Sequence, residues 1–247
     1  MAGSAFSALP RREGRPPRLV RPGLWLFPPN PEAHAGSSWL LETTAGDLLI
    51  DIPPDTEASL HFLVARAERG PGWIVLLGRD GHGRARRWQE RLDWPVLVQE
   101  QEAYLLPGVR RLIPFGAEHV VMEGLTLLWT PGPSPGAAVL HARGGVAGAV
   151  DGLFCGRLLV PVGPGQLAPL PSPRGFHAPR QRRSVARLAH WLPPGSPDWI
   201  ASGAGLGALA GAALVHGGAA QLAPFAAPLD GAIEGEKPTI TPLSILP

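Results

Sequence analysis

Short apolar runs separated by turn-forming residues mark the chain from Leu24 onward. Runs of this length, bounded by Gly, Pro, Asn, Asp or Ser, are typical of β-strands. The run at 73–77, WIVLL, is apolar throughout and predicts a strand buried on both faces. The pattern predicts strands at 23–27, 37–43, 47–52, 73–77, 96–98, 111–115, 119–123, 125–130, 137–142, 146–150, 158–160 and 199–201.

Helical spacing appears between some of these runs. Leu60, Val64 and Ala67 share one face of a helix expected at 57–69, with Asp55 or Thr56 as its N-cap. A further helix is expected at 179–192, with Pro in its first turn. The remaining helical predictions are 84–92, a helical turn at 101–106 and an Ala- and Gly-rich helix at 206–221, and a Pro/Gly loop is expected at 161–173.

The order of these elements predicts an α/β fold. Strands come first, strand–helix units follow, a second run of strands comes next, and a strand and helix close the chain. This order favours an αββα four-layer sandwich, in which two mixed sheets pack face to face with helices outside.

Glycine and proline, 32 and 30 of 247 residues, gather at the chain ends and between the apolar runs. Such composition predicts a disordered N-terminal tail at 1–18 and a Pro-rich tail at 223–247. The length between them, 19–222, suits one domain.

Charge and cysteine content exclude several classes of protein. The net charge is only +2, without a dense basic stripe, so nucleic-acid binding is not expected. A single cysteine excludes an internal disulfide and a cysteine-rich metal site. The sequence has no run of about 18 apolar residues, so no membrane span is expected. The first residues lack the order of a secretory signal, so we expect a cytoplasmic protein.

Five segments, in order, carry a resemblance to a known family. They are SSWLLETTAGDLLIDIPPD, WIVLLGRDGHGRARRW, WTPGPSPGAAVLHARGG, LFCGRLLV and DWIASGAGLGAL. Together they resemble the landmarks of the metallo-β-lactamase superfamily over about residues 20–222. The segments VQEQEAYLLPG and FHAPRQRRSV resemble a divergent branch of this fold from photosynthetic bacteria. The resemblance implies the αββα sandwich and, in ordinary members, a dinuclear zinc centre that hydrolyses its substrate.

The metal-binding positions implied by the resemblance are mostly replaced. Its histidine-rich motif is reduced to Asp80 and His82, while Pro133, Arg157 and Ala204 stand at three further ligand positions. A hydrolytic zinc site needs three protein ligands and an open position for water. An arginine places a fixed positive charge where the metal would lie. We therefore expect no cofactor, with Asp51, Asp80 and His82 as the only residual metal candidates.

Arg157 has two interpretations. Its planar guanidinium could bind a carboxylate or phosphate, or it could pair with Asp80 or Asp51 and plug the cleft. Both predict that Arg157 lies near Asp80. Asp80 and His82 are also the tentative acid–base pair of a catalytic site.

His177 and Arg180 are candidates for an anion pocket at a helix N-terminus. The alternative is that they belong to a solvated loop and a helix cap. Cys155 could be a nucleophile beside Arg157, but a buried core residue is favoured. Arg84, Arg87 and Arg91 share a helix face that is either a basic binding stripe or, more commonly, a solvated one.

Three functions follow from these observations. The first is a non-catalytic binding or scaffold protein that recognises a small anionic ligand or a protein partner. The second is a divergent hydrolase of an ester, thioester or lactone with a reduced or metal-free site. Nucleic-acid binding is the weaker third.

Overall fold

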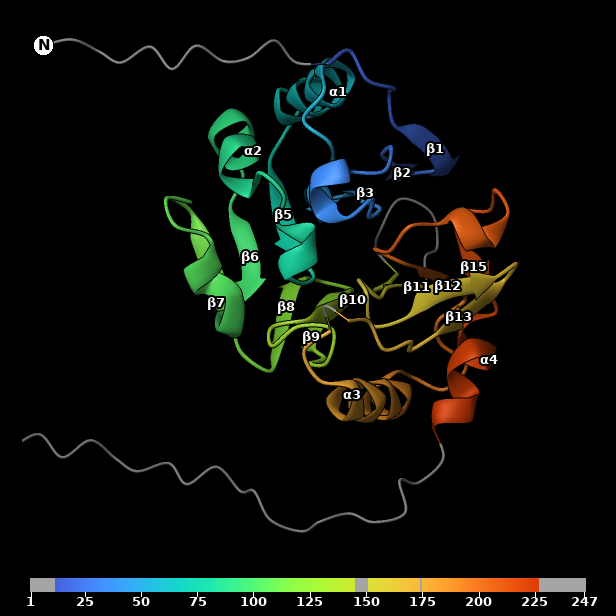
Figure 1. Ribbon diagram of the computed structural model, residues 1–247. Coiled ribbons are helices and arrows are strands. Elements are labelled where there is room, and N and C mark those ends of the chain that lie inside the picture. The colour runs from blue at the N-terminus through green and yellow to red at the C-terminus, as the bar shows by residue number, and fades with distance from the viewer. Residues whose placement is uncertain (1–11, 145–150, 174, 227–247) are drawn as a thin grey trace, which may run out of the picture.

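A computed structural model describes residues 12–144, 151–173 and 175–226 of the chain (Figure 1). The first half forms a seven-stranded sheet with the strands in chain order. Its last four strands run parallel, and the first four form antiparallel hairpins. The strands are β1 (Arg18–Arg21), β2 (Leu24–Leu26), β3 (Trp39–Thr43), β4 (Gly46–Ile50), β5 (Gly72–Leu76), β6 (Val96–Gln99) and β7 (Leu112–Phe115).

The second half forms a six-stranded sheet in the order β15-β14-β11-β10-β9-β8. Only β11 and β14 are parallel neighbours in it. Its strands are β8 (Glu118–Met122), β9 (Leu125–Trp129), β10 (Ala138–Arg143), β11 (Asp151–Phe154), β14 (Trp199–Ala201) and β15 (Val215–His216), and a separate hairpin joins β12 (Val160–Gly163) to β13 (Gln166–Ala168).

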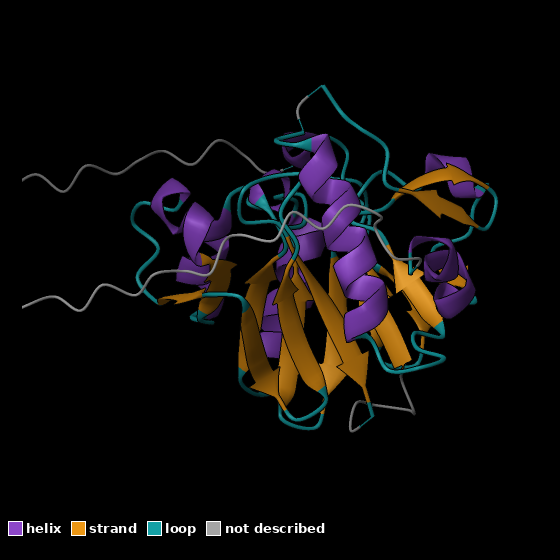
Figure 2. Cartoon of the chain, turned by 90° about the horizontal axis from the view of Figure 1, so that it is seen from below, coloured by secondary structure: helices purple, strands orange, loops and turns teal. Residues whose placement is uncertain are grey.

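Helices cover the outer faces of the two sheets, which confirms the predicted αββα sandwich (Figures 1 and 2). Helices α1 (Glu57–Ala67) and α2 (Ala85–Leu92) pack on the first sheet, and α3 (Ala178–Trp191) and α4 (Gly218–Leu222) on the second. Short 3₁₀ turns complete the chain: η1 (Pro31–Ala33), η2 (Arg79–Gly81), η3 (Glu100–Leu105), η4 (Gly207–Leu209) and η5 (Ala223–Phe225).

Strand alternation explains why the apolar runs are continuous. On β4, Leu48 and Ile50 enter the core between the sheets, whereas Leu49 enters the core beneath the helices. Successive side chains point to opposite faces of a strand, and here both faces are covered. A strand buried on both sides therefore reads as an unbroken apolar run.

Three predicted segments differ from the structure. The strand expected at 158–160 is wrong: β12 begins only at Val160, and β11, Asp151–Phe154, precedes it where no strand was expected. The loop expected at 161–173 contains the β12–β13 hairpin. The helix expected at 206–221 is wrong: the segment forms η4, β15 and the short α4. Gly211 and Gly217 adopt φ of 95° and 67°, which interrupts a helix in a segment whose many glycines already disfavour one. The strand predicted at 146–150 lies outside the described residues.

The described chain extends beyond both predicted domain limits. Before β1, the carbonyls of Arg12 and Glu13 accept the N–H groups of Glu57 and Ala58. Thr56 is the N-cap of the same helix, since its hydroxyl accepts from the Ser59 N–H. The segment before β1 thus satisfies free donors in the first turn of α1. Within the described residues no helix is long and apolar enough to cross a membrane.

Candidate functional site

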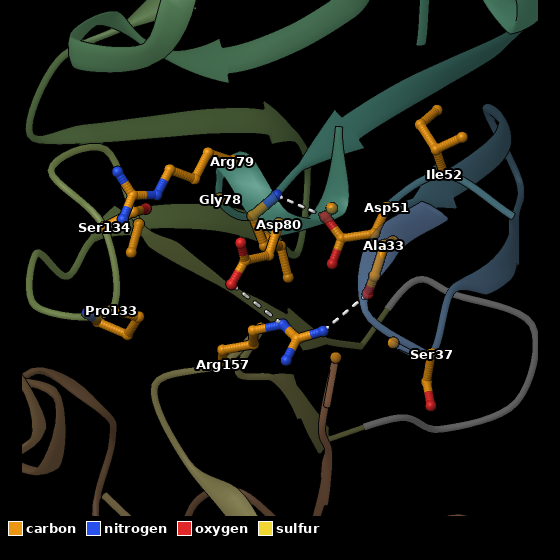
Figure 3. A pocket seen from close by; sticks show the side chains of 16 residues that line it. Ala33, Ser37, Asp51, Ile52, Gly78, Arg79, Asp80, Pro133, Ser134 and Arg157 are labelled. Carbon is orange, nitrogen blue, oxygen red and sulfur yellow. Dashed lines mark hydrogen bonds and ion pairs between the residues drawn. The ribbon is translucent and has the colours of Figure 1, made fainter. Parts of the chain in front are cut away.

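A small cavity lies where several strands end at one edge of the sandwich (Figure 3). Asp51 follows β4, Asp80 follows β5, Arg157 follows β11 and Gly203 follows β14, while Pro133 lies in the turn between β9 and β10. The space open to the centre of a water molecule is about 20 Å³. That volume holds about one or two waters. The site as seen therefore accepts a small group and not a large substrate.

Asp51 is held rigidly in the wall of this cavity. Its backbone has a left-handed φ of 56°, and its Oδ1 accepts the Leu77 N–H at 2.9 Å. A Cβ at Gly81 would lie 2.1 Å from Oδ1, and one at Gly203 would lie 3.2 Å from Oδ2. These close approaches require glycine at position 81. Strained backbone of this kind persists only where the surroundings fix it.

Burial raises the pKa of Asp51 to about 6, because the charged form loses its water. The Leu77 N–H and the positive charges of His82 and Arg157 oppose this rise, whereas the Glu102 carboxylate adds to it. Asp51 therefore changes its charge close to neutral pH, which is typical of carboxyl groups in functional clefts.

Arg157 crosses the cavity and is paired there (Figure 3). Its Nε lies 3.5 Å from Asp80 Oδ2, which confirms that the two residues are neighbours. Its Nη2 donates to the carbonyls of Ala33 at 2.8 Å and His34 at 3.4 Å. The Nε2 of His34 lies 3.8 Å from the other Asp80 oxygen. The guanidinium thus links the second sheet to the loop before β3.

His82, expected beside Asp80, turns towards a different carboxylate. Its Nε2 lies 3.3 Å from Oε2 of Glu102, a residue of η3 that is 1% exposed. The two atoms are not aligned for a hydrogen bond. Glu102 Oε1 accepts the Gly136 N–H at 3.1 Å. The structure therefore places Asp80 and His82 in different environments and does not bring them together as a pair.

Glu102 and Ser134 carried no expected role, although both lie in segments that support the resemblance. Ser134 lines the cavity and is 3% exposed. Its position next to Pro133, in a turn resembling a ligand-bearing one, is the only sequence signal that could have singled it out. Nothing in the spacing of Glu102 indicates that a turn of η3 would bury its carboxylate.

His177 and Arg180 lie at the start of α3 and are not among the residues that line the cavity. The Nδ1 of His177 accepts the Arg180 N–H at 3.1 Å, so His177 is the N-cap of the helix. The expected anion pocket and the cleft are thus separate places. His177 fills the capping position that a bound anion would otherwise use.

Cys155 and the arginines of α2 are not among the residues that line the cavity. Burial raises the pKa of the Cys155 thiol to about 12, so it is a core residue and not a nucleophile. Arg84 and Arg87 both pair with Asp55, at 3.3 and 2.6 Å, and Arg86 pairs with Glu90. These pairs neutralise much of the expected basic face.

Comparison of the fold with solved structures gives consistent matches. The BLEG-1 B3 metallo-β-lactamase matches at a TM-score of 0.54 and 17% identity, over 79% of this chain and 95% of that one. An archaeal metallo-β-lactamase superfamily protein from Sulfolobus tokodaii matches at 0.55 and 17%, over 81% and 83%. A protein crystallised in a di-iron-bound form matches at 0.51 and 24%, over 72% and 93%. No family model and no curated protein matches the sequence.

A dinuclear metal centre of the kind associated with this fold does not fit the residues present. Asp80 is engaged by Arg157, His82 lies against Glu102, and Asp51 is held by the Leu77 N–H. In the described parts of the chain, no three His, Cys, Asp or Glu side chains are grouped as metal ligands. A guanidinium inside the cavity would also repel a dication.

Proposed function

Since the chain has the metallo-β-lactamase fold, we propose that it is a non-catalytic binding protein whose cleft uses the guanidinium of Arg157, in place of metal ions, to hold a small anionic ligand. The observation that carries this proposal is the position of Arg157 in the cavity wall, with Pro133 lining the same cavity. The guanidinium supplies the positive charge of the cleft without any metal ligand.

The guanidinium has donor capacity left for a ligand. Of its three nitrogens, Nε faces Asp80 and Nη2 bonds to backbone carbonyls. Nη1 makes no hydrogen bond to any residue that the structure describes. Carboxylates and phosphates are the anions that a guanidinium binds best, because two donors can meet two oxygens.

The contact with Asp80 can be exchanged for a ligand. Its 3.5 Å separation exceeds the length of a normal charged hydrogen bond. Both side chains are about one quarter exposed, so a ligand can reach the pair from the solvent. A ligand carboxylate could therefore compete with Asp80 for Nε. A protein partner that presents an acidic side chain or a terminal carboxylate would use the same contact.

Titration of ¹⁵N-labelled protein with acetate, formate and phosphate at constant ionic strength tests the proposal. We expect saturable shifts of the amide signals of Gly36, which lies beside the guanidinium, and of Gly203, which lines the same cavity. Arg157→Met should abolish these shifts, and Arg157→Lys should weaken them because the fork is lost. Arg86→Met is the matched control, since it removes an exposed arginine at the start of α2 that pairs with Glu90 and does not line the cavity. Shifts that persist in Arg157→Met would overturn the proposal.

The second candidate is a metal-free hydrolase of an ester, thioester or lactone. The raised pKa of Asp51, about 6, in a cavity that also holds Arg157 favours it, because such a carboxylate can act as a general base. Turnover of an acyl-ester panel that is lost in Asp51→Asn would support this candidate. Equal turnover in the wild type, Asp51→Asn, Asp80→Ala and His82→Ala would exclude it.

A further inference from the structure

The outer face of α3 carries an excess of positive charge. The helix contains four arginines and no acidic residue, so its charge is +4, whereas the whole chain carries only +2. The rest of the chain is therefore net negative, at −2. A concentration of one sign of charge on one surface attracts segments of the opposite sign. All four arginines are exposed: Arg180, Arg182, Arg183 and Arg187.

The positive charge of α3 is uncompensated, unlike that of α2. On α2, Arg84 and Arg87 both pair with Asp55. Within the part of the chain that the structure describes, no ion pair joins an α3 arginine to a carboxylate. Arg187 donates from Nη2 to the Trp129 carbonyl at 2.9 Å, which leaves its charge unbalanced. The face of α3 is thus open to an acidic segment.

The described chain ends beside this helix. The short helix α4 leads into η5, and both pack on α3 (Figure 1). Phe225 of η5 packs against the apolar cluster that contains Val185 and Leu188 of α3. Ala226 follows directly. The residues after position 226 therefore continue from a point next to α3.

The acidic residues that follow are within reach of the basic face. Residues 227–236 read APLDGAIEGE and contain Asp230, Glu234 and Glu236, the last three acidic residues of the sequence. An extended chain spans about 3.3 Å per residue, so Asp230 can lie up to about 13 Å from Ala226, and Glu236 up to about 33 Å. Helix α3 has 14 residues and is about 21 Å long. The three carboxylates can therefore reach its arginines.

We propose that the basic face of α3 is the docking surface for the acidic segment 230–236 of the same chain. A short tether gives this segment an effective concentration of about millimolar beside the helix, so even weak surface ion pairs populate the contact. The contact is sensitive to salt, because the screening length falls from about 10 Å at 0.1 M to about 3 Å at 1 M. It does not involve the cleft, so it stands or falls separately from the proposed function.

A spin label at position 232 of the full chain tests the contact. Ala232→Cys places the label between Asp230 and Glu234, and the native Cys155 is buried and does not compete for it. In ¹⁵N-labelled protein at about 20 mM ionic strength, the label should broaden the amide signals of Arg182 and Arg183. The broadening should fall at least about threefold in 1 M salt, where the charges are screened. Amide signals of α2 should stay sharp under both conditions.

Two sets of variants separate docking from mere proximity of the tether. Asp230→Asn, Glu234→Gln and Glu236→Gln together keep the length of the segment but remove its charge, and should remove most of the broadening. Arg182→Gln with Arg183→Gln should have the same effect from the side of the helix. The matched control is Arg86→Gln with Arg91→Gln on α2, which removes the same charge elsewhere and should leave the broadening as in the wild type.

A charge swap distinguishes lost pairing from local damage to the helix. Arg182→Glu with Arg183→Glu should abolish the broadening, and adding Asp230→Lys, Glu234→Lys and Glu236→Lys should restore it. Equal broadening of α3 in the wild type and the triple amide variant would overturn the proposal. Signals of α3 that ignore the segment but shift with an added decaglutamate peptide, or with a short RNA, would also overturn it and assign the face to a separate acidic protein or to nucleic acid.

Discussion

Replacing Asp51 by asparagine should stabilise the protein at neutral pH. Asparagine has the shape of the protonated aspartic acid, tolerates the left-handed φ of 56° and keeps the acceptor for the Leu77 N–H. The pKa of Asp51 is raised from 3.8 to about 6 in the folded protein. At 1.36 kcal/mol per unit, this difference corresponds to about 3 kcal/mol.

The sign follows from linkage between protonation and folding. Because the folded protein holds the proton more tightly than the unfolded chain, Asp51 costs nothing below about pH 3.8. Its cost grows as the pH rises through this window and is complete above about pH 6. Asp51→Asn should therefore match the wild type in acid and exceed it at pH 7.5 by at most about 3 kcal/mol, or about 6–12 °C in Tm.

Urea unfolding at several pH values between 4 and 7.5 measures this difference directly. Asp93→Asn is the matched control, because Asp93 also has a left-handed φ, of 52°, but its side chain is 83% exposed. That variant should show no comparable pH-dependent gain. If Asp51→Asn were less stable than the wild type at pH 7.5, the charged form of Asp51 would be favoured by its surroundings, and the reasoning would be refuted.

Three further predictions concern a helix cap, a buried thiol and a glycine of the cavity wall. Thr56→Ala should lower the free energy of unfolding by about 1 kcal/mol, since it removes the N-cap bond to the Ser59 N–H; urea unfolding checks this, and an unchanged midpoint would contradict it. Cys155 should react with a thiol reagent at least 100-fold more slowly in the native protein than in urea, because its thiol is buried; fast native labelling would show that it is accessible. Gly81→Ala should unfold the site or shift Asp51, since its Cβ would lie 2.1 Å from the carboxylate; a variant with wild-type Tm and amide spectrum would disprove that close packing.

The layered fold could be predicted because strands covered on both faces leave continuous apolar runs. The WIVLL run became β5, with Ile74 beneath the helices and Val75 between the sheets. The resemblance of five ordered segments also predicted that Arg157 lies near Asp80, and the two side chains are neighbours in the structure. Order along the chain is therefore sufficient to place backbone landmarks at one edge of the sheets.

The direction of individual side chains could not be predicted in the same way. His82 follows the expected strand, but its ring turns to Glu102, which comes from a separate turn 20 residues later in the chain. The Glu102 carboxylate is also buried beside Ser134, which lies in the turn between β9 and β10. Such contacts depend on tertiary packing, and no local periodicity of the sequence reports them.

Zinc content tests the central claim, that a guanidinium replaces the metal centre, most directly. The purified wild-type protein is dialysed against a few equivalents of zinc, then against metal-free buffer, and its metal is measured by elemental analysis. Because Arg157 lies in the cavity and Asp51 and Asp80 are engaged by other groups, we expect well under about 0.1 equivalent of retained zinc. The Arg157→Met variant, which still lacks a set of metal ligands, should retain equally little. One or two equivalents of zinc that remain bound to the wild type would contradict the account.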